Sequence, residues 1–355
     1  MSGYQIPHFG LARQYRNLKD ELLDATDQVL TSGNLMNDQF TNRFESWLAM
    51  RTKTNFAVTV HSGTQALEII ARYHLEPYKT TFDIIPSVKI PNISYVATLN
   101  AFVNAGWEIE LVDTDKDGLI TQSDEFEDVV KSICAVGLYG AVPKIPATFN
   151  TTIVDGAQHW LVADDVGDAM AISFDPTKNL PASGNGGAIV TNDRNLWEFA
   201  HSYRSNGKND HTMYGTNSRM SEQECAQILV RAKYIDKWQW RRKQIRHYYL
   251  DEFKNLPFRC LSRDHSVHAD QKFVIYTDNR DDLNQHLIKA GIETKIHYNK
   301  ALSEYPIAAK LKKPDMISTS VMLCRGVLSL PIYPELSDGE VEYIVKKVKE
   351  FFTYH

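Results

Sequence analysis

The chain has 355 residues, 43% of them hydrophobic, which is enough for one large domain and a smaller one. A formal net charge of −5 provides no overall basic field for nucleic acid or an anionic membrane. The first residues lack an apolar signal-like segment, no later run approaches a membrane span, and the four cysteines lack metal-binding spacing. We therefore expect a cytoplasmic protein without a metal site.

The N-terminal part predicts two helices followed by a strand–turn–helix unit. Apolar residues recur at helical spacing over residues 15–30 and again over residues 39–50. An apolar run at 56–60 then ends at Ser62-Gly63-Thr64, where another helical pattern begins. Such a turn presents free N–H groups and the positive end of the helix dipole, so it can bind an anion. The same residues also suit an ordinary helix N-cap, and the turn alone favours that simpler role.

Residues 84–140 predict further elements of an α/β domain. Two short strands should flank a helix at about 96–104, with Tyr95 at the turn from strand to helix. A further strand is expected at 133–140. The connection at 141–152 is twelve residues long and contains two prolines, so we expect an irregular loop instead of the usual crossover helix.

The stretch from residue 153 to 192 points most directly to chemistry. Asp155 ends one apolar run, and Lys178 follows a second, AMAISF, ahead of a Gly-rich segment. Both runs resemble buried strands, which place residues at their carboxyl ends. An isolated lysine is usually a surface residue, but a desolvated one can form a Schiff base with an aldehyde cofactor. Asp155 favours the second interpretation, because pyridoxal phosphate (PLP) needs a lysine for its aldehyde and an acid for its ring nitrogen.

The rest of the chain predicts a polar loop, a long helix and a smaller α+β unit. A Gly-dotted polar loop at 204–220 follows a helix at 194–203, and loops of this length are usually functional or disordered. A long helix should run from the capping box Ser221–Glu224 to about residue 253. The elements expected beyond it are a strand at 272–277, a helix at 281–291 and a final helix that begins at the capping box Ser337–Glu340.

Taken together, these motifs resemble the DegT/StrS family of sugar aminotransferases. Members of that family are fold type I, PLP-dependent enzymes that act mostly on nucleotide-linked keto sugars. Five motifs occur in the family's order: Gly63-Thr64, Asp155-x-x-Gln158, Ser173-x4-Lys178, Gly186-Gly187 and Asn217-x-Arg219. The resemblance covers nearly the whole chain.

The resemblance implies roles for the matching residues. Lys178 would carry PLP and act as the catalytic base, while Asp155 would keep the ring nitrogen protonated. Tyr95 would stack on the ring, and Gln158 would lie beside it. The residues implied at the phosphate are Ser62, Gly63, Thr64, Ser173 and, from the other subunit of a homodimer, Asn217. The residues implied at the substrate are Arg219, His297 and Tyr298.

We therefore predict an α/β fold with a mostly parallel sheet, flanking helices and a smaller C-terminal α+β domain, divided into residues 1–230 and 231–355. The predicted activity moves an amino group from glutamate or glutamine to a keto sugar, with a nucleotide-linked sugar favoured. A non-catalytic or regulatory role stays open, because the 141–152 connection is short and Asp175 and Asn185 replace the family's usual His and Glu. A PLP-dependent sugar dehydratase is disfavoured, since those relatives carry histidine in place of Lys178.

Overall fold

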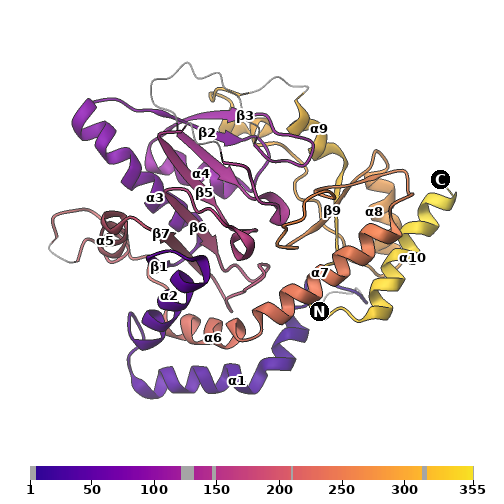
Figure 1. Cartoon of the computed structure of the whole chain (residues 1–355), viewed down its shortest axis with the longest axis horizontal. Coiled ribbons are helices and arrows are strands. Elements are labelled where there is room, and N and C mark those ends of the chain that lie inside the picture. Colours follow the sequence, from indigo (N-terminus) through magenta and orange to yellow (C-terminus); the bar gives the residue numbers. More distant parts are fainter. Residues whose placement is uncertain (1–4, 121–131, 146–148, 209–210, 314–317, 355) are drawn as a thin grey trace.

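A seven-stranded sheet forms the centre of the larger part of the molecule (Figure 1). The computed structural model describes residues 5–120, 132–145, 149–208, 211–313 and 318–354. The strands are β1 (Phe56–Val60), β2 (Ser87–Pro91), β3 (Glu108–Val112), β4 (Ser132–Val136), β5 (Thr151–Asp155), β6 (Ala169–Ser173) and β7 (Gly187–Thr191), in the order β1-β7-β6-β5-β4-β2-β3. Strands β3, β2, β4, β5 and β6 are parallel, and β7 is antiparallel to β6 and β1. The carboxyl ends of β1, β2, β4, β5 and β6 therefore meet at one edge.

Helices cover both faces of this sheet. One face is packed by α3 (Gly63–Pro77), α4 (Val96–Ala105) and α5 (Arg194–Tyr203), and the other by α1 (Leu11–Ser32), α2 (Gln39–Thr52) and α6 (Glu222–Ala232). Strand β6 shows the alternation that makes this possible: Ala169 and Ala171 join the first core, whereas Met170 and Ile172 join the second. Because both faces are buried, the strand is apolar from Ala169 to Ile172.

A smaller unit follows, built on a three-stranded antiparallel sheet. It contains α7 (Ile235–Glu252), β8 (Arg259–Cys260), β9 (Phe273–Tyr276), α8 (Arg280–Lys289), α9 (Thr319–Gly326), β10 (Val327–Leu330) and α10 (Asp338–Tyr354). Figure 1 shows α7 and α10 beside α8 in this unit, and both helices contribute to its core. Short helical turns lie at Tyr78–Phe82, Leu138–Gly140, Trp160–Val162, Leu302–Glu304 and Pro306–Ala308. None of the described helices is long and apolar enough to cross a membrane.

Two predicted elements differ in the structure. The strand expected at 133–140 ends at Val136, because Leu138–Gly140 forms a 3-10 turn in which Tyr139 has a φ of 62°. The helix expected from Ser221 to residue 253 is broken between α6 and α7 at Lys233 and Tyr234. The break lets α6 pack on α1 and α2 while α7 packs in the smaller unit. The predicted helix-free connection is confirmed for residues 141–145 and 149–150, and residues 146–148 lie outside the described part.

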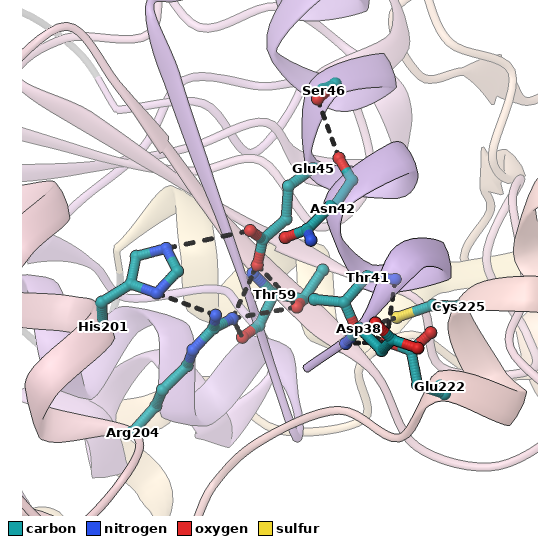
Figure 2. Close-up of polar contacts among 10 residues, drawn as sticks. All are labelled: Asp38, Thr41, Asn42, Glu45, Ser46, Thr59, His201, Arg204, Glu222 and Cys225. Atoms are coloured by element: carbon teal, nitrogen blue, oxygen red, sulfur yellow. Dashed lines mark hydrogen bonds and ion pairs between the residues drawn. The ribbon is translucent and has the colours of Figure 1, made fainter. Parts of the chain in front are cut away.

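A buried polar network ties β1 to the segment that begins after α5 (Figure 2). The Arg204 guanidinium donates to Glu45 Oε1 at 2.6 Å and to the Thr59 carbonyl at 2.6 Å. The backbone N–H of Thr59 donates to the same Glu45 oxygen at 2.8 Å. His201 lies against the guanidinium, and its pKa falls to about 4 because of burial and the Arg204 charge. This neutral histidine accepts from Arg204, so the network fixes the strand that leads into Ser62.

Glu222 is a second buried carboxylate, also drawn in Figure 2. It accepts hydrogen bonds from the backbone N–H groups of Asp38, Phe40 and Thr41 at 2.7, 2.8 and 3.0 Å. These are N–H groups at the start of α2, which lack partners within the helix. The Glu222 carboxylate on α6 therefore caps α2, and its negative charge interacts favourably with the positive end of the α2 dipole.

We expect Glu45→Ala to lower the free energy of unfolding by about 3–5 kcal/mol, because it leaves the buried Arg204 charge without its partner. Urea denaturation measures this change. The matched control is Glu198→Ala, which removes the exposed partner of Arg194 on α5 and should cost only about 0.5 kcal/mol or less. Equal, small losses in both variants would show that the network contributes little to stability.

Candidate active site

A cavity of about 380 Å³ lies at the edge of the sheet where the carboxyl ends meet, beside the smaller unit. Ten of the twelve residues predicted from the sequence line it: Ser62, Gly63, Thr64, Tyr95, Asp155, Gln158, Ser173, Lys178, His297 and Tyr298. They come from both parts of the chain, since the first eight end or follow strands of the large sheet and the last two follow α8. The fold thus gathers these side chains at one place, as the strand-end argument predicts.

One end of the cavity is formed by the start of α3. Ser62 is the N-cap, and its Oγ accepts from the backbone N–H of Gln65 at 3.2 Å. A Cβ on Gly63 would lie 2.7 Å from the Cβ of Ser173, so only glycine allows β6 to approach this turn so closely. The N–H groups of the first helical turn and the Ser173 hydroxyl consequently border the same space. The two interpretations of this turn are compatible, because a capped helix start can also bind an anion.

Asp155 ends β5 and is held in one orientation by two hydrogen bonds. Thr98 Oγ1 donates to Oδ2 at 2.8 Å, and the Ala157 N–H donates to Oδ1 at 3.1 Å. Burial raises the pKa of the carboxyl group, and these two donors together with the Lys178 charge act in the opposite direction. The carboxylate therefore has partners for its charged form in a site that water scarcely reaches.

Lys178 lies on the loop after β6, which Asp175 shapes. Asp175 Oδ1 accepts from the Thr177 N–H at 2.9 Å, and the Asp175 carbonyl accepts from the Lys178 N–H at 2.9 Å. Burial lowers the pKa of the Lys178 amine, although Asp155 and Asp175 partly counteract it. A lower pKa increases the fraction of neutral, nucleophilic amine.

Tyr139 connects the remaining polar groups of the cavity wall. Its N–H donates to Gln158 Oε1 at 2.6 Å, and its hydroxyl donates to the His297 carbonyl. Gln158 Nε2 lies 3.4 Å from the Tyr298 hydroxyl, and Tyr298 faces Tyr95 with ring centroids 6.1 Å apart. Gln158 is therefore oriented from both parts of the chain. Tyr95 itself is 59% exposed and borders the cavity at the start of α4.

Comparison with known proteins identifies the family of the chain. The DegT/DnrJ/EryC1/StrS aminotransferase family matches residues 16–349. The chain belongs to this family. The prediction made from the motifs is confirmed at that level, and so is the predicted α/β fold.

Similar proteins cover the chain almost completely. The erythromycin biosynthesis sensory transduction protein EryC1 of Saccharopolyspora erythraea is 30% identical over 97% of this chain and 99% of its own length. The dTDP-3-amino-3,4,6-trideoxy-alpha-D-glucose transaminase of Streptomyces venezuelae is 29% identical over 98% and 96%, respectively. The crystal structure of S. venezuelae DesV in complex with a ketimine intermediate has a TM-score of 0.84 at 28% identity and covers 96% of each chain.

Two of the predicted site residues of this aminotransferase lie outside its own cavity. Asn217 is exposed, and its Oδ1 accepts from the Arg219 guanidinium at 3.2 and 3.3 Å. The segment that carries them is well anchored, because Ser218 bonds through its backbone to Arg204 and to His61 at 3.0 and 2.7 Å. Asn217 is thus exposed and Arg219 half-buried, and neither lines the cavity that holds Lys178 of the same chain.

The structure also adds residues in and behind the cavity wall that the motifs did not indicate. Thr98 contacts Asp155 from the first turn of α4, where a threonine in an apolar helix gives no functional signal. Asp175 and Thr177 shape the Lys178 loop. Lys272 lines the cavity and is buried. The only sequence signal for it is a lysine directly before the apolar run of β9.

Proposed function

We propose that this enzyme is a PLP-dependent aminotransferase that moves an amino group from glutamate or glutamine to a nucleotide-linked keto sugar. The observation that carries the proposal is the placement of the Lys178 amine and the Asp155 carboxylate in one cavity with the start of α3. The family assignment supports amino transfer, and the transaminase of S. venezuelae, named for a dTDP-linked amino sugar, supports the substrate class.

The residues present fit the aldehyde, the ring nitrogen and the phosphate of PLP. Lys178 supplies the amine for the aldehyde, and among the described residues no hydrogen bond or ion pair occupies its Nζ. Asp155 supplies the acid for the ring nitrogen. The turn Ser62-Gly63-Thr64 and the Ser173 hydroxyl supply donors for the phosphate, in a place where glycine keeps the space open. When bound, PLP acts as the electron sink that makes the bonds at the donor's α-carbon reactive.

The protein groups around that centre have separable roles. The Lys178 amine is the base that would remove the proton from the donor's α-carbon, because its lowered pKa favours the unprotonated form. Asp155 would keep a proton on the ring nitrogen, and Thr98 would hold the carboxylate in the required direction. Tyr95, exposed at the cavity mouth, would cover one face of the ring.

Product analysis tests the proposed activity. The PLP-loaded protein is incubated with glutamate or glutamine and a panel of nucleotide-linked keto sugars, and the sugars are analysed by mass spectrometry. We expect one or more sugars to exchange the keto oxygen for an amine. Loss of water without gain of nitrogen would indicate a dehydratase instead. A protein that binds PLP but converts no donor would indicate a regulatory role.

We propose further that the active protein is a homodimer in which each subunit supplies Asn217 to the other's phosphate site. Asn217 is exposed and does not line the cavity of its own chain, which supports this arrangement. Asn217→Ala should weaken PLP retention by about 1–3 kcal/mol, the cost of one charge-assisted hydrogen bond. Equilibrium dialysis of PLP measures the loss, and Asn195→Ala, an exposed asparagine on α5, is the control.

Mixing two defective variants tests whether the site is shared. Lys178→Ala and Asn217→Ala subunits, assayed at limiting PLP, should together regain activity, because a heterodimer holds one site with both residues intact. Fluorescence energy transfer between labelled subunits confirms that they exchange. Exchange without regained activity, or a fully active monomer, would rule out the shared site.

A further inference from the structure

Lys272 is a second lysine in the active-site cavity, and the roles proposed above do not use it. Only 5% of its surface is exposed. Its N–H donates to the Tyr139 carbonyl at 3.0 Å, and its ammonium donates to Gln271 Oε1 at 2.8 Å. Gln271 Nε2 in turn donates to the Thr177 carbonyl at 2.9 Å. The Lys272 ammonium is therefore positioned from the loop that carries Lys178.

This ammonium has no carboxylate partner among the described residues. Gln271 provides one neutral acceptor for a group that has three donors. Asp175 is near enough to raise the pKa of both Lys272 and Lys178, but its Oδ1 already accepts from the N–H and hydroxyl of Thr177 at 2.9 and 2.5 Å. A buried ammonium without a counter-ion is unfavourable, and burial accordingly lowers the pKa of Lys272. An arriving carboxylate favours the protonated form of the amine, so the site is suited to an anion that comes with a ligand.

Amino transfer from an amino acid brings an anion into the cavity that Lys178 and Lys272 both line. The α-carbon of the donor must come within reach of the Lys178 amine, and its α-carboxylate is bonded directly to that carbon. A cation next to Lys178 can therefore fix the donor and orient the bond that reacts. We propose that Lys272 binds the α-carboxylate of the amino donor, an inference that rests on the proposed function.

The other basic groups near the cavity are less suited to this task. Arg242 on α7 is buried and already donates to the Ile332 and Asp270 carbonyls at 2.6 and 3.3 Å. Burial lowers the pKa of His8 and His297, so both imidazoles are neutral at physiological pH. Lys178 is the proposed attachment point of PLP. Among the described residues of the same chain, Lys272 is thus the basic side chain in the cavity lining that remains for a carboxylate.

Binding of glutarate tests the proposal without turnover, because glutarate has the carbon chain of glutamate but lacks its amine. Calorimetry on PLP-loaded protein should show glutarate binding about 10- to 100-fold more weakly to Lys272→Met than to wild type, the loss of one hydrogen bond to a charge. Lys272→Arg should retain most of the affinity, and it shows whether a positive charge suffices. Lys289→Met, at an exposed position on α8, is the matched control and should bind as wild type.

The pH dependence separates direct binding from a structural role. Burial and the charges of Lys178 and Arg242 lower the pKa of Lys272, while Asp175 raises it, with a net shift downward. Only the protonated amine attracts a carboxylate, so glutarate affinity should fall as pH rises through this lowered pKa. Lys272→Arg should not show this fall, because guanidinium stays charged. His8 and His297 are present in both proteins and cannot account for the difference.

Steady-state kinetics test whether the carboxylate that Lys272 binds belongs to the amino donor or to the sugar. Lys272→Met should raise KM for the amino donor about 10- to 100-fold and leave KM for the keto sugar within about threefold. A larger effect on the sugar would contradict the assignment and place an acidic sugar there instead. Unchanged glutarate binding in folded Lys272→Met, or no binding by wild type, would overturn the proposal. If no donor reacts with the wild type, the proposed function fails, whereas glutarate binding still tests Lys272 independently.

Discussion

Lys178→Ala should reduce amino transfer at least about a thousandfold, because the variant loses both the cofactor's attachment point and the catalytic base. The rate is measured as transfer of amine from glutamate or glutamine to PLP in a single turnover. The fold should survive, since Lys178 lies on a loop beside a cavity and is not one of the apolar side chains that form the cores.

A matched substitution and a stability measurement make this result specific. Lys289→Ala removes an exposed lysine from α8 and should keep wild-type activity. Thermal unfolding of Lys178→Ala should stay close to that of the wild type. Substantial single-turnover activity in the folded variant would mean that another amine performs the chemistry, and Lys272 also lines the cavity.

Asp155→Asn should lower kcat by about 100- to 1000-fold while changing PLP affinity much less. The amide cannot hold a protonated ring nitrogen, so stabilisation is lost where charge develops in the transition state. The phosphate site at the start of α3 and Lys178 remain in this variant, and they should supply most of the binding energy for PLP. A kcat within about threefold of the wild type would show that Asp155 is not the ring partner.

Thr98→Val provides a milder companion to Asp155→Asn. The Thr98 hydroxyl lowers the pKa of Asp155 by stabilising its ionised form, against the upward effect of burial. Without that hydrogen bond the pKa of Asp155 should rise further. The carboxylate would then ionise at a higher pH, and the acidic limb of the kcat–pH profile should move upward. An unchanged profile would indicate that Thr98 does not tune Asp155.

The sequence alone predicted the parts of the fold and the site that depend on local pattern. Asp155 and Lys178 follow apolar strands, and Ser62-Gly63-Thr64 stands between a strand and a helix, so parallel topology brings them to one edge. The break between α6 and α7 was missed, because the helical pattern continues through Lys233 and the change of packing partner is a tertiary effect.

The missed site residues share a physical reason. Thr98 and Tyr139 contact the cavity residues Asp155 and Gln158, which are distant in sequence. Lys272 lines the cavity itself, and no spacing rule connects any of the three to Lys178. Tyr139 also adopts a positive φ that interrupts an otherwise strand-like run. Such residues become visible only once the two parts of the chain are assembled around the cavity.

Reductive trapping at Lys178 tests the central claim most directly. PLP-loaded protein is treated with borohydride, digested and mapped by mass spectrometry, before and after addition of the amino donor and then of a nucleotide-linked keto sugar. We predict a pyridoxyl group on the Lys178 peptide that disappears after glutamate or glutamine and returns after the sugar that is aminated. A label on a different lysine, or one that no amino donor removes, would contradict the account.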